Sequence, residues 1–510
     1  MTPSKWRYRM LPLATLLLAA CHSSSPVSGA ADPDAAPGTR CDNPAPPGTM
    51  EASIEVDVPS DTDATANPTP TTRIPLTVHL PRRCPGERFP LILYGHGFSE
   101  SRGSVNSGLI DDGNMQPLLE RGYVAIKFDQ RGHGDNRPPL GGGYSRLMDP
   151  AVETQDARAI LDWAWEHAAE IHVQTEPGSG VAKDLRVGTL GASYGGGFQL
   201  QLVALDSRID VIAPDRTWHS LLHSVLPGDV LKTMARLLTL FIQLDQLVPG
   251  QGVTTTPLMQ SFANQVGPLA PTANLVRTRE ELAAALERPT TLPRPVSEEE
   301  AIEFVQTHAP DYFQARELAG QPWGFGAPQS RLRPVPALFT QGQRDVLFSA
   351  TEAYRNASWF EAAGAEVRVI THEDGHQNPL AGQTRGVWAC GTVNAQEAIL
   401  AWLDRWLKGR DSAAFRAIPK VCISVLDSGD PQATPVGVAL ERFPVGSLDG
   451  QGAVPLRVPT VSATVGPADA DGLFLPLATI AGEGRVLAGI PRVGQVTVTR
   501  GIGTLQAAIA

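Results

Sequence analysis

The segment LGASYGGGFQ, residues 190–199, places one serine among four glycines. Gly191, Ser193 and Gly195 form the pattern G-x-S-x-G, between the apolar runs LRVGT and GGFQLQLVAL. After a strand and before a helix, this pattern predicts a sharp turn that lifts a serine hydroxyl above a sheet, where it can attack an acyl carbon. The flanking residues are small because strand and helix approach closely. A nucleotide-binding turn is the other interpretation, but the spacing is not G-x-G-x-x-G and no P-loop lysine follows.

A serine hydroxyl is a weak nucleophile and needs a general base that an acid holds in place. In turns of this type the chain order is serine, acid, histidine. Asp345 ends the strand-like run VPALFTQGQRD, and His376 ends the next such segment, AEVRVITHEDGH. Both are therefore expected in loops at the carboxyl ends of strands, where open α/β sheets bind ligands. We predict a triad of Ser193, Asp345 and His376, with His372 and Asp374 as rival candidates.

Acyl transfer also requires N–H donors for the developing oxyanion. One donor is expected from Tyr194, the residue after the nucleophile. The other is expected from Phe98, in the loop GHGF after the run FPLILY. His96 of this loop either orients it or is simply packed, and both interpretations remain open.

Strand-like and helix-like runs alternate along the chain up to about residue 215. Strands are predicted at 53–58, 73–80, 89–97, 123–132, 185–191 and 210–214, and helices at 111–122, 150–171 and 196–205. This alternation implies an α/β class fold, with a mostly parallel sheet and helices on both faces.

The alternation resumes near residue 335, and the stretch between is helical. TREELAAALE and SEEEAIEFVQTHA each begin with a capping box, and residues 229–248 form an amphipathic pattern better explained by a packed helix than by a membrane span. We therefore predict a helical cap at 215–334, inserted into a core formed by residues 51–214 and 335–410. The turn-rich, strand-like tail at 411–510 predicts a small β-sandwich.

The N-terminus is typical of an exported bacterial protein. The positively charged stretch MTPSKWRYRM precedes LPLATLLLAA, which is too short to span a bilayer, and Leu18–Cys21 resembles a lipobox. We predict a lipoprotein signal peptide at 1–20, a lipid on Cys21 and a flexible tether at 21–50. The chain would then be anchored in the bacterial cell envelope, at the outer membrane or the periplasmic face. An ordinary secretory signal is the alternative.

The remaining cysteines predict two disulfides in an exported chain, and three pairings are possible. The pairing of sequence neighbours, Cys41 with Cys84 and Cys390 with Cys422, is favoured. No C-x-x-C spacing indicates zinc, and no pattern implies another metal or an organic cofactor. The net charge of −11 and the lack of a basic patch argue against a nucleic-acid partner.

Several segments together resemble the X-prolyl dipeptidyl peptidase and cocaine-esterase group of serine hydrolases. FDQRGHGDN is similar to that group's D-x-R-G-x-G-x-S segment, and ETQDARAILDWAW, VGTLGASYGGGFQ and AWLDRWLKG match the group in order. The resemblance covers about residues 70–500 and is strongest over 89–200. It implies an α/β-hydrolase core, a helical cap and a C-terminal jelly roll that includes DADGLFLPLATI. It also implies the triad named above, with Asp129 and Arg131 as braces of the active-site loops.

The chain departs from the group at one position of the oxyanion loop. Relatives carry Pro-Tyr there, and the tyrosine hydroxyl donates to the oxyanion, whereas this chain has Phe98. X-prolyl dipeptidyl peptidases also need an acidic anchor for the substrate's free amine. Glu280, Glu281 or Asp311 could serve, but nothing singles one out. We expect an exported serine hydrolase that cleaves a small-molecule ester. A dipeptidyl peptidase acting on short peptides, or a non-catalytic surface-binding lipoprotein, is the alternative.

Overall fold

The computed structural model describes the protein mainly between residues 41 and 444. The described residues are 41–57, 71–104, 115–149, 152–225, 232–248, 252–255, 259–260, 263–264, 332–376, 386–426, 430, 432–444, 460–465 and 494–499. The predicted signal peptide, the lipid site at Cys21, most of the tether and most of the predicted cap lie outside them. So do both predicted capping boxes and most of the predicted β-sandwich.

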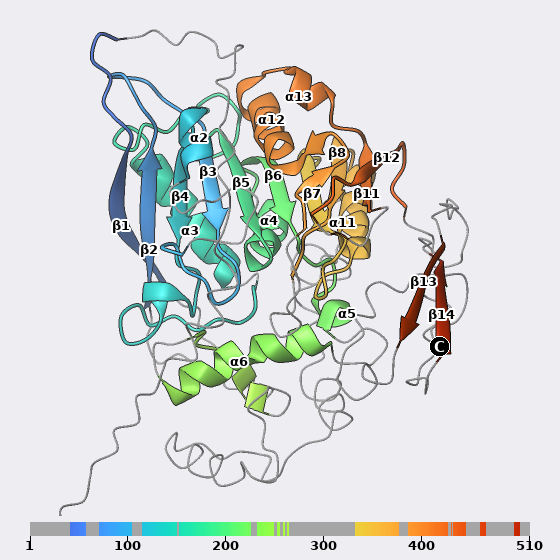
Figure 1. The fold of residues 1–510 in the computed structure, drawn as a ribbon. Coiled ribbons are helices and arrows are strands. Elements are labelled where there is room, and N and C mark those ends of the chain that lie inside the picture. Colours follow the sequence, from blue (N-terminus) through green and yellow to red (C-terminus); the bar gives the residue numbers. More distant parts are fainter. Residues whose placement is uncertain are drawn as a thin grey trace, which may run out of the picture.

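Within the described part of the chain, ten strands form one sheet in the order β1-β2-β4-β3-β5-β6-β7-β8-β11-β12 (Figure 1). The seven strands from β4 to β11 in this order run parallel, while β1, β2 and β12 are antiparallel to their neighbours. The predicted mostly parallel α/β sheet is confirmed. The strands are β1 (Gly48–Asp57), β2 (Thr71–Leu80), β3 (Leu91–Gly95), β4 (Val124–Phe128), β5 (Val187–Ala192), β6 (Ile209–Asp215), β7 (Ala337–Gly342), β8 (Val367–His372), β11 (Val421–Val425) and β12 (Val436–Leu440).

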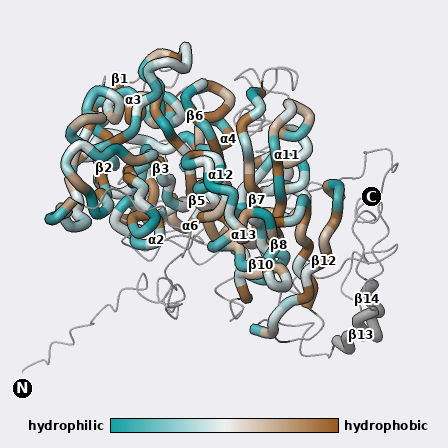
Figure 2. Tube along the Cα trace, turned by 90° about the horizontal axis from the view of Figure 1, so that it is seen from above, coloured by the Kyte–Doolittle hydropathy of each residue, from teal (hydrophilic) through white to brown (hydrophobic). Residues whose placement is uncertain are grey.

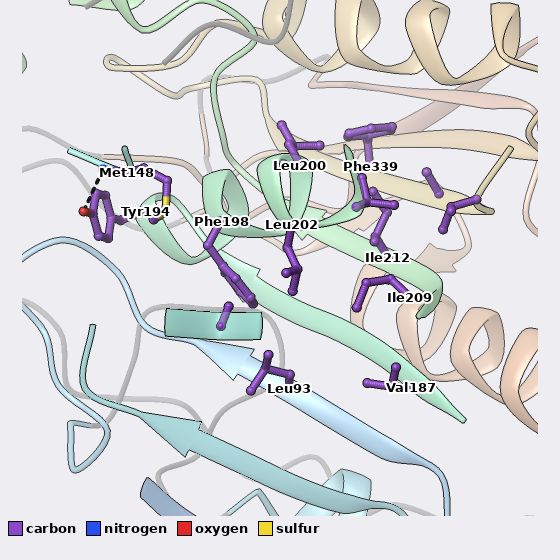
Figure 3. Packing of buried hydrophobic residues seen from close by; sticks show 14 of the residues in the cluster. Leu93, Met148, Val187, Tyr194, Phe198, Leu200, Leu202, Ile209, Ile212 and Phe339 are labelled. Atoms are coloured by element: carbon purple, nitrogen blue, oxygen red, sulfur yellow. Dashed lines mark hydrogen bonds between the residues drawn. The ribbon is translucent and has the colours of Figure 1, made fainter. Parts of the chain in front are cut away.

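Helices cover both faces of this sheet. One face carries α3 (Glu153–Glu166), α4 (Tyr194–Leu205) and α11 (Ala350–Ala362), and the other carries α2 (Gln116–Glu120), α12 (Ala395–Lys408) and α13 (Ala413–Arg416). Because helices cover both faces, most side chains of the central strands are apolar, as the hydropathy colours show (Figure 2). Figure 3 shows Phe198 and Leu202 of α4 pointing toward Leu93 and Val187 of the sheet.

Local signals explain where some helices begin and end. The side chain of Asn394 accepts a hydrogen bond from Glu397 N–H and starts α12, and Gly409, with φ 70°, ends it in the left-handed conformation. In α3, four apolar residues at helical spacing form one buried face: Ala157, Ile160, Leu161 and Ala164.

The chain leaves the sheet after β6 and returns at β7, its neighbour. Between them the structure describes α5 (Leu221–Val225) and α6 (Thr233–Leu247), and α6 lies below the sheet in Figure 1. None of the helices in the described ranges, α6 included, combines the length and apolar character that a bilayer crossing requires.

The first two strands after residue 411, predicted as part of the β-sandwich, belong instead to the main sheet, so this part of the prediction is wrong. The run KVCISVL forms β11, which pairs in parallel with β8, and β12 extends the same sheet. This apolar run is buried against the core and is bonded through Cys422 to Cys390 of the short strand β9 (Ala389–Cys390), which pairs with β10 (Val393–Asn394). Farther on, β13 (Thr460–Val465) pairs with β14 (Gly494–Thr499), and the sandwich itself remains a prediction.

Both disulfides favoured from the sequence are present. Cys41 is bonded to Cys84, and Cys390 is bonded to Cys422. The first fastens the segment before β1 to the loop after β2, and the second fastens β9 to the core strand β11.

Candidate active site

Ser193 occupies the tight turn between β5 and α4. Its backbone has φ 57° and ψ −117°, a conformation that costs energy for a residue with a side chain. The Ser193 N–H donates to Asp215 O at 2.9 Å, which ties the turn to the end of β6. A Cβ atom at Gly195 would lie 1.9 Å from Gly95 O, so only glycine allows this close approach. The predicted strand–turn–helix context is therefore the one observed.

The structure brings the three predicted triad side chains together. His376 Nε2 lies 2.7 Å from Ser193 Oγ, and His376 Nδ1 lies 2.6 Å from Asp345 Oδ2. Burial alone would raise the pKa of Asp345. The facing His376 and the N–H groups of Phe348 and Leu347, which donate to Oδ1, instead hold this pKa below its ordinary value. The carboxylate therefore stays ionised beside the imidazole.

The two rival residues have other partners. His372 is fully buried; its Nδ1 accepts a hydrogen bond from Asp374 N–H, and its Nε2 faces Asp215 at 3.5 Å. Asp374 accepts a hydrogen bond from Trp388 Nε1 at 2.6 Å and lies 3.8 Å from the Arg216 guanidinium. Neither makes the contact with Ser193 that His376 makes.

A buried ionic cluster lies at the ends of β6 and β8, beside the triad loops, and sequence analysis missed it. Arg216 Nε donates to Asp215 Oδ2 at 2.8 Å, and Thr340 Oγ1 donates to the other carboxylate oxygen at 2.8 Å. Burial would raise the pKa of Asp215, but Arg216 and His372 hold it below its ordinary value. No local pattern predicts this cluster, because its members come from three separate strand ends.

The two predicted oxyanion residues line the same pocket as Ser193. The Tyr194 hydroxyl accepts a hydrogen bond from Met148 N–H at 3.0 Å (Figure 3), and it lies 3.1 Å from Ser145 Oγ. The Phe98 ring packs edge-on against the Tyr194 ring at 5.7 Å between centroids. Among the described residues, none accepts a hydrogen bond from Phe98 N–H.

His96 is both packed and orienting. Its Nε2 accepts the Gln130 N–H at 3.1 Å, so the imidazole is neutral and its Nδ1–H donates to Gly97 O at 2.8 Å. Burial lowers the pKa of His96 to about 4, which agrees with the neutral form. The residue thereby links the loop after β3 to the loop after β4.

Asp129 and Arg131 hold the neighbouring loops, as the resemblance implied. Asp129 accepts hydrogen bonds from Arg102 N–H at 2.7 Å and Asp135 N–H at 2.9 Å. Arg131 makes a buried two-pronged contact with Asp156 of α3, at 2.6 and 2.7 Å. Neither residue touches Ser193 Oγ.

Two further residues fasten the start of the cap region to the core, one at the loop of Asp345 and one at helix α11. Lys232 Nζ donates to Leu347 O at 2.5 Å. The buried carboxylate of Glu352 on α11 accepts hydrogen bonds from His219 N–H at 2.7 Å and Ser220 N–H at 2.9 Å. Both contacts join segments more than a hundred residues apart in sequence, so sequence patterns carry no signal for them.

Ser193 opens into an apolar pocket that is partly open to solvent. Helix α6 forms one wall. No charged side chain lines the pocket among the residues that the structure describes, and Glu280, Glu281 and Asp311 lie outside those residues. Apart from Ser193 and Tyr194, the lining consists of Phe98, Leu147, Trp218, Leu221, Val225, Ala235, Leu238, Thr239, Ile242, Met259, Leu347 and Phe348.

Comparison with known proteins gives one family match and several distant structural likenesses. The family model for X-Pro dipeptidyl-peptidase (S15 family) matches residues 71–378. No curated protein matches the chain significantly.

Three solved structures illustrate the structural likenesses. A CocE/NonD family hydrolase from Staphylococcus aureus shares 12% identity with a TM-score of 0.45, over 83% of this chain and 59% of the other. The acylaminoacyl peptidase of Pyrococcus horikoshii shares 12% identity with a TM-score of 0.36, over 72% and 43%. A Pyrococcus furiosus esterase shares 14% with a TM-score of 0.35, over 70% and 93%. This chain thus spans less than two thirds of the Staphylococcus hydrolase, and likenesses at these TM-scores carry no argument about activity.

Proposed function

The chain belongs to the X-Pro dipeptidyl-peptidase (S15) family of α/β-type serine hydrolases, and from this premise we propose that it cleaves acyl bonds, preferably esters, through an acyl-enzyme on Ser193. The observation that carries the proposal is the continuous contact from Ser193 through His376 to Asp345, with Ser193 in the lining of an apolar pocket. The order and contacts of these groups are those that nucleophilic acyl transfer requires.

Each side chain has a distinct role in this mechanism. His376 Nε2 takes the proton of Ser193 Oγ as the oxygen attacks the acyl carbon, and later gives that proton to the leaving group. Asp345 holds the Nδ1–H tautomer and stabilises the imidazolium that forms. The N–H groups of Tyr194 and Phe98 receive the oxyanion, and water then releases the acid.

The pocket supports an ester of an apolar acid as substrate. Its described lining is almost entirely aliphatic and aromatic, which favours burial of an uncharged group. A dipeptidyl peptidase would need a carboxylate to bind the free amine of its substrate, and the described lining contains none. Peptidase activity remains the second candidate, because it is the activity for which the family is named.

The proposal is tested with an active-site probe and a substrate panel. The wild-type chain is expected to react with a fluorophosphonate and to hydrolyse p-nitrophenyl esters, and Ser193→Ala should abolish both reactions. Ser358→Ala is the matched control, because this α11 serine hydroxyl donates to Tyr354 O and lies outside the pocket lining. Cleavage of an Xaa-Pro amide without ester cleavage would overturn the ester preference. An unlabelled wild-type chain would instead indicate a non-catalytic binding protein.

We also propose that the chain is exported and lipid-anchored through Cys21. The support is the charged and apolar leader before that cysteine, together with two disulfides, which persist in oxidising compartments.

A further inference from the structure

We infer that Glu100 is a positioning residue for the oxyanion hole: its carboxylate fixes the Gly97 segment so that the Phe98 N–H is presented to the substrate. The inference rests on the proposed function of Ser193. It explains how a loop that carries phenylalanine, which has no hydroxyl to donate, can still stabilise an oxyanion.

The argument begins with the hydrogen bonds of Gly97. Its N–H donates to Glu100 Oε2 at 2.8 Å. Its carbonyl accepts from His96 Nδ1–H at 2.8 Å and from Glu100 N–H at 3.2 Å. Both backbone polar groups of Gly97 are therefore hydrogen-bonded, and Glu100 makes two of these three hydrogen bonds.

These contacts determine where the Phe98 N–H points. The Gly97 carbonyl and the Phe98 N–H belong to one planar trans peptide, so they point in opposite directions. With the carbonyl held by His96 and Glu100, the N–H is directed away from both. It donates to no described residue, and Phe98 lines the Ser193 pocket. A donor that is fixed and unoccupied before the reaction is what oxyanion stabilisation requires.

The Phe98 side chain also helps to hold the peptide between Gly97 and Phe98 in place. Its ring packs edge-on against Tyr194 at 5.7 Å and against the buried His133 at 5.4 Å between ring centroids. Because Tyr194 begins α4 and supplies the second predicted donor, this packing fixes the two donors relative to each other.

The Glu100 carboxylate occupies the space where a side chain at position 97 would begin. A Cβ atom there would lie 2.9 Å from Glu100 Oε2 and 3.1 Å from its carboxyl carbon. Gly97→Ala would therefore displace the flexible end of Glu100, whose carboxylate supplies the three atoms nearest to the added Cβ. This substitution offers a second, independent way to break the same contact.

The experiment compares Glu100→Ala, Glu100→Gln and Gly97→Ala with the wild type. Glu100→Ala should lower kcat for a p-nitrophenyl ester about tenfold or more while KM changes less than about twofold, because a displaced donor weakens only transition-state binding. The rate of fluorophosphonate labelling should fall in parallel. Glu100→Gln keeps an acceptor oxygen for the Gly97 N–H and should restore most of the rate.

Glu87 provides a matched control. Its carboxylate accepts the Cys84 N–H and its own N–H donates to Cys84 O at 3.2 Å, so the same pair of hydrogen bonds joins residues three apart, but neither residue lines the pocket. Glu87→Ala should leave kcat unchanged. The double variant Gly97→Ala/Glu100→Ala should be no slower than the slower single variant, because both changes remove one contact.

Three results would overturn the inference: an unchanged kcat in Glu100→Ala, a loss that appears in KM alone, or a loss that Glu100→Gln does not restore. The thermal transition of each variant is measured alongside, so that unfolding is recognised. A wild-type chain that neither hydrolyses esters nor reacts with the fluorophosphonate would contradict the proposed function itself. If instead the wild type is active and the Glu100 variants are as fast as the wild type, only the inference about Glu100 is contradicted.

Discussion

Ser193, His376 and Asp345 are each held by neighbours that do no chemistry. Asp215 O accepts the Ser193 N–H, and the Leu347 and Phe348 N–H groups orient Asp345. The side chain of His376 is 15% exposed, whereas that of Asp345 is fully buried. Water can thus reach the base while the acid stays sheltered, as an acyl-enzyme mechanism with a hydrolytic second step needs.

At the residue scale, we predict that Asp345→Asn lowers kcat by about 10³- to 10⁴-fold, because the amide cannot hold the correct His376 tautomer or stabilise its cation. KM should change little. The measurement is steady-state hydrolysis of the ester used for the wild type. Asp374→Asn is the control, because Asp374 contacts Trp388 and Arg216 instead of His376. A loss in Asp374→Asn as large as that in Asp345→Asn would contradict the assignment.

The sequence could predict the triad because each member has a local signal: the G-x-S-x-G turn for Ser193 and a strand end for Asp345 and His376. The strand-end signal alone favours His376 only weakly over its rival His372, which is the last residue of β8. That choice depends on which imidazole faces Ser193 in three dimensions. The role of Glu100 could not be predicted from the sequence for a related reason. An acid three residues after a glycine is a common pattern, and only the structure shows that this one bonds to the Gly97 N–H beside the pocket residue Phe98.

At the scale of elements, a buried aspartate at the amino end of β6 bonds to the amino end of β5, and its ionisation costs free energy. Asp210 on β6 accepts the Val187 N–H of β5 at 2.8 Å. Burial, assisted by the nearby Glu176, raises its pKa to about 7. Between about pH 4, where an exposed aspartate ionises, and about pH 7, the folded chain binds one more proton than the unfolded chain at this site. Asp210 therefore lowers the stability as pH rises through this window.

We predict that Asp210→Asn is more stable than the wild type at pH 8 by about 1 to 3 kcal/mol, and that the advantage shrinks toward pH 4. Asn keeps an oxygen for the Val187 N–H. Urea unfolding at several pH values measures the difference. A difference that does not vary with pH would contradict the prediction.

Asp206 is the matched control for this experiment. It also follows α4 and is mostly buried, yet Arg208 outweighs burial and holds the pKa of Asp206 below its ordinary value. Its stabilising contribution is present at neutral pH and is lost on acidification. Asp206→Asn should therefore destabilise the chain at pH 8, the opposite sign to Asp210→Asn.

Elements with one strong pattern were predictable, and those defined by distant pairing were not. The buried face of α3 follows from its helical spacing, and β3 and β4 follow from their apolar runs. The sequence predicts β11 as part of the C-terminal tail, because this strand follows the long helix α12 in a turn-rich stretch. Only its pairing with β8 and its disulfide place it in the core.

At the scale of the whole molecule, two disulfides reinforce the sheet region. They close loops of 43 and 32 residues, and cross-links of this length stabilise by about 4 kcal/mol each in the chain-entropy model. Such bonds suit an exported chain, since a reducing cytosol does not preserve them.

We predict that Cys21→Ser moves the chain from the detergent-rich to the aqueous phase in a detergent partition assay, because the proposed lipid on this residue would be its anchor. The catalytic rate should not change, since the first of the described lining residues in the sequence is Phe98. Equal partitioning of the wild type and the variant would contradict the lipid proposal.

The passage from β6 to β7 has a consequence for how such an enzyme can diversify. These two strands are neighbours that pair in parallel, so the insertion between Asp215 and Ala337 starts and ends on adjacent strands of the finished sheet. Eight of the fourteen described residues that line the pocket belong to this insertion, whereas Ser193, Asp345 and His376 belong to the sheet region. Exchanging the insertion would therefore replace much of the pocket wall while the nucleophile, base and acid keep their places in the sheet.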